Sequence, residues 1–160
     1  VTIHPRSGIE FVKPGLELTR ATYQFRGIVE AAAVAVYAET TDEADMATVE
    51  SRHRQALAGI EAEGLTPALR DEMEALENLL HNSIIASLRN PLIETSYRRL
   101  HTYLKLVRLD RKLTVPVAQR SIREHLDIID ALAARDPDRA EAAVVPHFSA
   151  GLQAPLGMVV

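Results

Sequence analysis

Glu77 and His81 carry side chains that can bind a cation, and they stand four residues apart in the segment ENLLH. Residues at positions i and i+4 of a helix project from the same face, one turn apart. Both border an apolar stripe at helical spacing, which consists of Leu69, Met73, Leu76, Leu80, Ile84 and Leu88. Because a carboxylate that points into a protein interior is costly unless something pairs with it, this segment predicts a buried partner for Glu77.

Two further histidines fall on predicted inward faces. His125 lies within the apolar face that runs from Ile122 to Ile129, and His147 follows Val144 on another face. Imidazole and carboxylate ligands suit a first-row transition metal, and a set without thiolates argues against a closed structural zinc site. The three imidazoles and the Glu77 carboxylate are therefore candidate ligands of one divalent metal ion, with positions left open for water or a ligand.

The same residues also have a simpler interpretation. A single histidine on an apolar face is commonly a core residue bonded to a carboxylate or a carbonyl, and Glu77 with His81 can be an intrahelical pair contributing roughly 0.2–0.5 kcal/mol. His53 and His101 also lie on or beside apolar faces, so an inward position does not select four residues, and His4 is expected in solvent. A metal centre and a metal-free helical interaction bundle both stay open at this point.

The elements that must position these residues are helices. Helical periodicity predicts an all-α antiparallel bundle of six to seven helices over residues 16–153. A first helix over residues 17–39 has its predicted core stripe at Phe25, Ile28, Val29, Ala32 and Val36. The remaining predicted stripes follow the same spacing, so the fold class follows from the pattern alone.

Capping residues mark where these helices begin and end. Thr40 and Glu43 stand at capping-box spacing, and Gly64 is a good helix terminator. The pairs Thr66-Pro67, Asn90-Pro91 and Asp136-Pro137 each combine an N-cap residue with a proline in the first turn. Short capped connections favour antiparallel neighbours.

The first 14 residues differ from the rest. Val1 and Ile3 alternate, and turn chemistry follows at residues 5–8, so the segment is interpreted as part of a β-hairpin. A lone hairpin arm is not stable, and we therefore expect this stretch to be the end of a missing N-terminal unit.

Composition excludes several classes. The chain has 160 residues, no cysteine and a net charge of -4, with a pI of about 5.9. That length suits one domain, the absence of cysteine removes disulfides and thiolate metal sites, and an acidic domain is a poor nucleic-acid binder by itself. We expect no membrane span and a cytoplasmic protein.

An ordered set of short motifs resembles a known family, the effector-binding C-terminal domain of GntR-type bacterial transcription regulators of the FadR group. Each motif alone is weak, but together they extend from Leu16 to Leu152. The matching residues are Phe25-Arg26-Gly27-Ile28-Val29-Glu30; Glu77-x-x-x-His81 with Ile84 and Ala86-Ser87-x-x-Asn90; Arg123-Glu124-His125 with Ile129, Ala131 and Asp136; and His147, 22 residues after His125. Residues 5–12 resemble the wing that closes the family's winged-helix DNA-binding domain.

The resemblance implies that Glu77, His81, His125 and His147 bind one divalent metal, zinc or nickel, inside the bundle. Two departures matter. The family usually has aspartate where this chain has Glu77, and Pro146 directly before His147 is expected to kink its helix.

The resemblance also implies an effector site and partners. Arg26 is expected to bind the carboxylate of a small organic acid beside the metal, with Tyr97 and Arg98 as weaker pocket candidates; the alternative for Arg26 is a surface pair with Glu30. Residues 1–14 would then be the tail of a missing winged-helix domain, and residues 15–160 an effector-binding and dimerisation domain. The expected protein is a homodimer that acts on operator DNA through the missing domain.

The resemblance does not suggest an enzyme. A ferritin-like di-iron bundle needs two Glu-x-x-His motifs and two further inward glutamates, and the Glu77–His81 spacing does not fit that pattern. A metalloenzyme on a helical bundle is therefore the weakest alternative.

Overall fold

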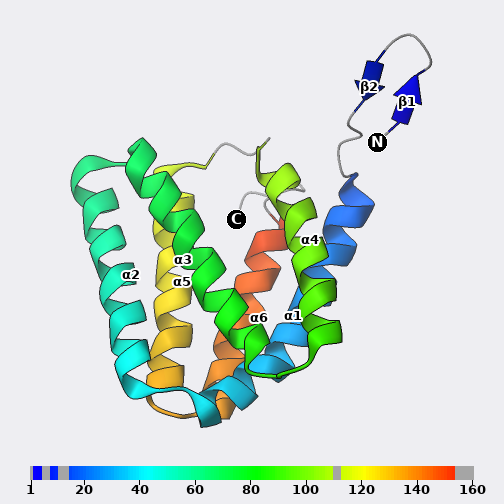
Figure 1. Cartoon of the computed structure of the whole chain (residues 1–160). Coiled ribbons are helices and arrows are strands. Elements are labelled where there is room, and N and C mark those ends of the chain that lie inside the picture. Colours follow the sequence, from blue (N-terminus) through cyan, green and yellow to red (C-terminus); the bar gives the residue numbers. More distant parts are fainter. Residues whose placement is uncertain (1, 5–7, 11–14, 110–112, 154–160) are drawn as a thin grey trace.

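The computed structural model describes residues 2–4, 8–10, 15–109 and 113–153 (Figure 1). In these ranges the chain forms six helices, which confirms the predicted all-α bundle. They are α1 (Leu16–Thr40), α2 (Glu43–Glu63), α3 (Pro67–Ala86), α4 (Pro91–Leu109), α5 (Val115–Ala133) and α6 (Pro137–Gln153). Within the described part of the chain, no helix combines the length and apolar character needed to cross a bilayer.

Helices α1, α6, α5 and α2 pack in that order, each antiparallel to the next, and α3 lies across them with α4 beside it (Figure 1). Two apolar clusters hold the bundle together. The larger one includes Leu80 and Ile129, and the smaller one includes Leu76 and Ile122. On α3 the smaller cluster includes Leu76 and the larger one Leu80, and on α5 they include Leu126 and Ile128. Glu77 and His125 therefore lie where the two clusters adjoin.

Three of the predicted helix starts are confirmed by their cap geometry. The Thr66 hydroxyl accepts a hydrogen bond from the backbone N–H of Leu69 at 3.2 Å, and the Asn90 side chain accepts from two backbone N–H groups. Asp136 accepts from the backbone N–H of Arg139 at 3.0 Å. Gly64 ends α2 with a φ of 74°, a conformation that suits glycine.

The predicted capping box at Thr40 is wrong. Thr40 is the last residue of α1, and its hydroxyl donates back to the Val36 carbonyl at 2.9 Å. An N-cap residue needs an extended backbone, which Asp42 has, and the Asp42 carboxylate accepts from the backbone N–H of Ala44 at 2.8 Å. Helix α1 therefore continues to the residue that the pattern had assigned to the next cap.

The predicted core stripe of α1 is also wrong, because much of it faces outward. The side chain of Ile28 is 67% exposed and that of Val36 is 37% exposed. The buried face of α1 instead contains Thr22, Arg26 and Glu30 together with small apolar residues. The reason is that α1 covers a polar site rather than a purely apolar core.

A β-hairpin precedes the bundle. Strands β1 (Thr2–His4) and β2 (Gly8–Glu10) pair antiparallel, with Ile3 opposite Ile9. They flank the turn that was predicted at residues 5–8, of which residues 5–7 lie outside the described ranges.

Candidate metal centre

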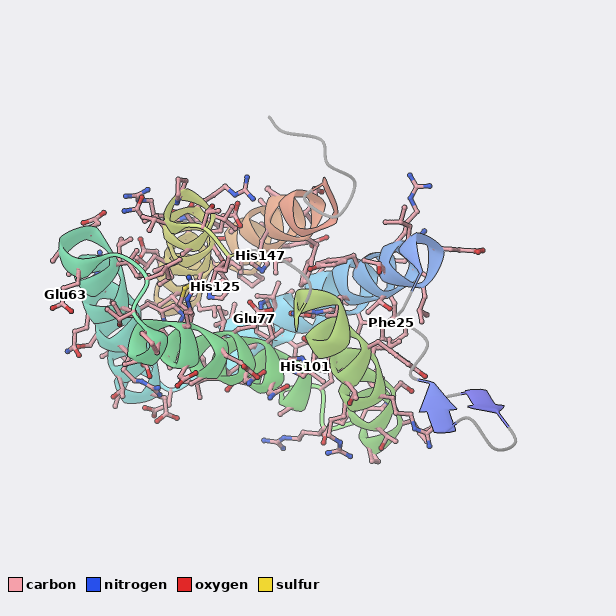
Figure 2. The ribbon with its side chains drawn as sticks, turned by 90° about the horizontal axis from the view of Figure 1, so that it is seen from above. Phe25, Glu63, Glu77, His101, His125 and His147 are labelled. Atoms are coloured by element: carbon pink, nitrogen blue, oxygen red, sulfur yellow. The ribbon has the colours of Figure 1, made fainter. Side chains whose placement is uncertain are left out.

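Glu77, His81, His125 and His147 come together in the interior of the bundle. Each offers one ligand atom, and these atoms lie within 4.8 Å of one another. Glu77 and His81 come from α3, His125 from α5 and His147 from α6, and all four side chains are buried. Figure 2 shows Glu77, His125 and His147 between the helices. The His125 and His147 rings, with centroids 4.8 Å apart, bring α5 and α6 together here, and the His81 ring of α3 lies 5.2 Å from that of His147.

Helix α6 brings His147 to the site despite the proline before it. Pro146 lies inside the helix, which continues to Gln153. Val144 and Phe148 are buried on the same face as His147, and that packing aims the imidazole inward. Pro146 therefore does not prevent His147 from reaching the other three residues.

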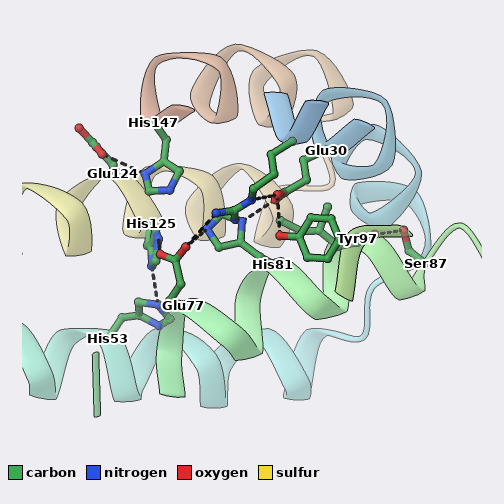
Figure 3. Close-up of polar contacts among 11 residues, drawn as sticks. Glu30, His53, Glu77, His81, Ser87, Tyr97, Glu124, His125 and His147 are labelled. Atoms are coloured by element: carbon green, nitrogen blue, oxygen red, sulfur yellow. Dashed lines mark hydrogen bonds and ion pairs between the residues drawn. The ribbon is translucent and has the colours of Figure 1, made fainter. Parts of the chain in front are cut away.

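In each of the three imidazoles the Nδ1 atom contacts a side chain outside the cluster of four (Figure 3). The Nδ1 atom of His81 lies 2.5 Å from Glu30 Oε2, and that of His147 lies 2.9 Å from Glu124 Oε2. His125 Nδ1 lies 3.2 Å from Nε2 of His53, a residue of α2. Because Nδ1 is engaged in every ring, Nε2 is the atom that each ring can offer to a ligand.

The Nε2 atoms of His81 and His125 are buried and lack a hydrogen-bond partner. They lie 3.5 Å and 3.4 Å from the two carboxylate oxygens of Glu77, outside good hydrogen-bond geometry. Buried polar atoms without partners are rare in folded proteins, and imidazoles oriented by carboxylates are typical of metal ligands. The donor set therefore fits a divalent transition metal ion, and Glu77 in place of aspartate still reaches the cluster.

Burial and charge act differently on the groups of this site. Burial opposes ionisation of Glu30, but the attraction of His81 and Arg26 outweighs it and lowers the pKa of Glu30 to about 2. For His81, burial is outweighed by Glu30 and Glu77, so its pKa is raised. Burial dominates for His125 and lowers its pKa to about 3. Burial likewise lowers the pKa of His53.

Arg26 lies beside the cluster, 1% exposed, with its guanidinium shared between two carboxylates. Its Nε donates to Glu30 Oε1 at 2.9 Å and its Nη1 to Glu77 Oε1 at 3.3 Å, while its Nη2 is buried without a hydrogen-bond partner. The predicted i,i+4 pair of Arg26 with Glu30 thus exists, but it is buried rather than on the surface. The rings of Phe148 and Tyr97 lie 4.9 Å and 5.5 Å from the guanidinium carbon.

Tyr97 reaches the same network, but Arg98 does not. The Tyr97 hydroxyl donates to Glu30 Oε1 at 2.7 Å, and the side chain is 2% exposed. The Arg98 side chain is 69% exposed and contacts its neighbours Thr95 and Glu94 on the surface of α4. The structure therefore separates Arg98 from the other predicted site residues.

The sequence pattern does not indicate the supporting roles of Glu30, His53 and Glu124. The sequence indicates Glu30 only as a partner of Arg26 and as the end of the Phe25–Glu30 motif, and His53 only as one more inward histidine. Glu124 precedes His125 in the chain yet contacts His147, a partner 23 residues away. Only its place within the Arg123-Glu124-His125 motif had marked it, because contacts across helices leave no spacing signal.

Comparisons with known proteins agree with this architecture. The metal-free FCD domain of TM0439, a candidate transcriptional regulator, superimposes with a TM-score of 0.69 at 18% identity, covering 89% of this chain and 94% of that chain. The Zn²⁺-bound form of that domain gives a TM-score of 0.68 at 18% identity, covering 88% and 93%. At this identity the likeness shows a common fold. The comparison with curated proteins finds no match.

The amino-acid sequence shows to which family the chain belongs. The profile of the FCD domain matches residues 21–150, which include α2 to α5 entirely, most of α1 and most of α6. This range also holds all four candidate metal ligands and Arg26. The chain therefore belongs to the FCD domain family.

Proposed function

We propose that this chain is the ligand-sensing domain of a GntR-type transcription regulator, and that it binds a divalent metal ion through Glu77, His81, His125 and His147. The observation that carries the proposal is the convergence of these four buried groups with every imidazole anchored through Nδ1. FCD domains belong to transcription regulators and not to enzymes, which sets the metalloenzyme alternative aside. The Zn²⁺-bound relative supports zinc as the first metal to test, with nickel next.

The effector in this proposal is a small carboxylate. Among the buried charged groups, Glu30 and Glu77 outweigh Arg26 by one negative charge, and a divalent ion reverses that balance to one positive charge. When bound, the metal supplies positive charge and open coordination positions. A monocarboxylate then neutralises the site, and the unpartnered Nη2 of Arg26 can donate to it.

Tyr97 acts in this proposal through its neighbours. Its hydroxyl is already donated to Glu30, so it holds Glu30 and thereby Arg26 in place. The effector must be small because it lies between helices of one bundle. The family resemblance points to a hydroxy acid or a sugar acid.

The rest of the proposal concerns DNA and the oligomer. The β1–β2 hairpin supports the interpretation of residues 5–12 as the wing of a winged-helix domain, which would place the protein at operator DNA in the cytoplasm. The outward stripe of α1, with Ile28, Ala32 and Val36 exposed, supports a homodimer. The effector then acts by shifting the relative pose of the two DNA-binding domains.

Metal content tests the metal centre directly. The protein is purified without a His-tag, and bound metals are measured by mass spectrometry. We expect about one equivalent of a divalent ion in the wild type. His125→Ala should lose it, and His4→Ala, in the hairpin, should retain it. Unchanged metal content in His125→Ala would show that the four residues do not form one site, and this would favour the metal-free interaction bundle.

Calorimetry against a panel of organic acids tests the effector. Arg26→Lys keeps the buried positive charge but loses the planar fork, so we expect weaker binding of acids with metal content intact. Arg98→Ala is the matched control, because its side chain lies on the surface, and it should bind as the wild type does. Binding of neutral or cationic metabolites but of no acid would contradict the proposal.

The homodimer is tested with Ile28→Asp. A charge within the exposed stripe of α1 should dissociate the dimer while the helical content is kept. Light scattering that finds the wild type monomeric at micromolar concentration would argue against the dimer.

A further inference from the structure

His53 is a buried histidine outside the set of four candidate ligands. It lies on α2, is 0% exposed, and has both ring nitrogens in contact with a partner. Its Nδ1 is 2.8 Å from the Val49 carbonyl oxygen, one turn earlier in the same helix, and its Nε2 is 3.2 Å from His125 Nδ1 (Figure 3). The contacts thus form a short chain from a backbone carbonyl to a candidate metal ligand.

The carbonyl determines the direction of this chain. A carbonyl oxygen can only accept, so the proton of a neutral His53 must be on Nδ1, which leaves a lone pair on Nε2. His125 Nδ1 must then be the donor to that lone pair. Since a neutral imidazole has one proton, His125 Nε2 is left with a lone pair that points into the cluster. The reverse arrangement would place two buried acceptors against each other at Val49, which is costly.

This direction opposes what Glu77 would favour. Glu77 Oε2 lies 3.4 Å from His125 Nε2, and a carboxylate at that place favours a proton on Nε2, the tautomer in which Nε2 cannot bind a metal. His81 and His147 are oriented by the carboxylates of Glu30 and Glu124, which can accept only from an Nδ1–H group. A third carboxylate at the fully buried position of His53 would be costly, whereas a neutral imidazole is not.

We propose that His53 is a positioning residue that sets the tautomer of His125, through its bond to the Val49 carbonyl, so that His125 Nε2 is ready to bind the metal. This inference rests on the proposed metal centre and extends it to α2. It assigns a role to a histidine that sequence analysis could not separate from a core residue.

NMR of the full chain, ¹⁵N-labelled and metal-free, tests the tautomer without any metal. Two-bond ¹⁵N–¹H correlations report which nitrogen of each histidine carries the proton. We expect the wild-type His125 to carry it on Nδ1, and we expect His53→Phe, which removes the acceptor, to shift it toward Nε2, beside Glu77. A wild-type His125 with its proton on Nε2 would overturn the proposal.

Zinc affinity, measured by competition with a chelator, tests the consequence. Loss of an outer partner of this kind lowers metal affinity about 10–100-fold, and we expect that loss in His53→Phe. His53→Gln places an amide oxygen near the former Nε2 and should recover part of the affinity. Ile60→Ala is the control, because it removes apolar packing from the same helix, two turns away from His53, and leaves both histidines in place.

The two proposals fail in different ways. A folded His53→Phe variant that binds zinc as tightly as the wild type would overturn the role of His53 alone. A wild type that binds no divalent ion would overturn the metal centre, and the tautomer measurement would still decide whether His53 sets the proton on His125. Equal loss of affinity in Ile60→Ala and His53→Phe would show that His53 only stabilises the fold.

Discussion

Helices α1 and α5 both present an apolar stripe in the sequence, but they use it in opposite ways. In α5 the predicted stripe is the buried one, with Ile122 and Ile129 in the core and His125 between them. In α1 the predicted stripe faces outward at Ile28, and the buried face carries Arg26 and Glu30. Periodicity shows that a helix has two different faces, but it does not show which face lies against the protein interior.

The difference follows from what each helix covers. α5 contributes to both apolar clusters, whereas α1 contributes only to the larger one, through Tyr23, Ala33, Val34 and Ala38. α1 covers the polar network around Glu30, where one carboxylate contacts Arg26, His81 and Tyr97. Such charges can be buried because they neutralise and hydrogen-bond one another.

Substitution of Glu30 should have the largest effect on stability. Glu30→Ala leaves the Arg26 guanidinium buried without its main partner, and we expect a loss of about 3–5 kcal/mol in the free energy of unfolding. Glu17→Ala, at an exposed position of the same helix, should change it by less than about 0.5 kcal/mol. Urea denaturation of both variants measures the difference. A small effect of Glu30→Ala would mean that the buried face of α1 is not organised around this carboxylate.

A matched pair of isoleucines compares the two helices directly. Ile129 in α5 is 0% exposed, so Ile129→Ala should lower the free energy of unfolding by about 2–5 kcal/mol. Ile28→Ala in α1 should change it by less than about 0.5 kcal/mol at protein concentrations where the chain is monomeric. Thermal and urea unfolding both report this contrast. Equal losses would contradict the outward orientation of the α1 stripe.

The protonation of the two rings should respond differently to pH: His81, which contacts Glu30 of α1, and His125 of α5. In metal-free protein the pKa of His81 is raised by Glu30, whereas burial lowers that of His125 to about 3. On lowering the pH, NMR should therefore show His81 protonated above the usual value of about 6.5 and His125 still neutral well below it. His125 titrating before His81 would contradict this order.

The proton that His81 takes up competes with the metal for the His81 imidazole. Zinc cannot bind a protonated His81, so lowering the pH from about 8 to about 6 should weaken zinc binding by about tenfold per pH unit where one proton is displaced. Chelator competition at several pH values measures it. An affinity that is constant over this range would exclude His81 as a ligand.

The smallest expected effect concerns the end of α1. Asp42→Ala removes the N-cap of α2 and should cost about 1 kcal/mol, while Thr40→Ala should cost a few tenths of that amount, about 0.3 kcal/mol. Both variants are compared by thermal unfolding. A larger loss for Thr40→Ala would restore the helix boundary that was predicted from the capping-box spacing.

Local features of the sequence were sufficient for the fold class and for most helix boundaries. Thr66, Asn90 and Asp136 cap their helices as predicted, because a cap depends on side chains that act within three residues of their own position. Glu77 and His81 share a face for an equally local reason, the helical repeat. His125 and His147 were identifiable as inward residues, but the residues alone left both a shared metal centre and a metal-free bundle open, and the family resemblance favoured the shared centre.

What the sequence by itself determined is therefore the set of helices, their caps and the candidate ligands. The tertiary structure decided which face of α1 is buried, that Arg98 lies apart from the site, and that Glu30, His53 and Glu124 orient the three imidazoles. These outcomes depend on contacts between residues that are far apart in the chain, as in His53 with His125, which are separated by 72 positions. No spacing rule within one helix can encode such a contact, because it exists only where separate helices pack together.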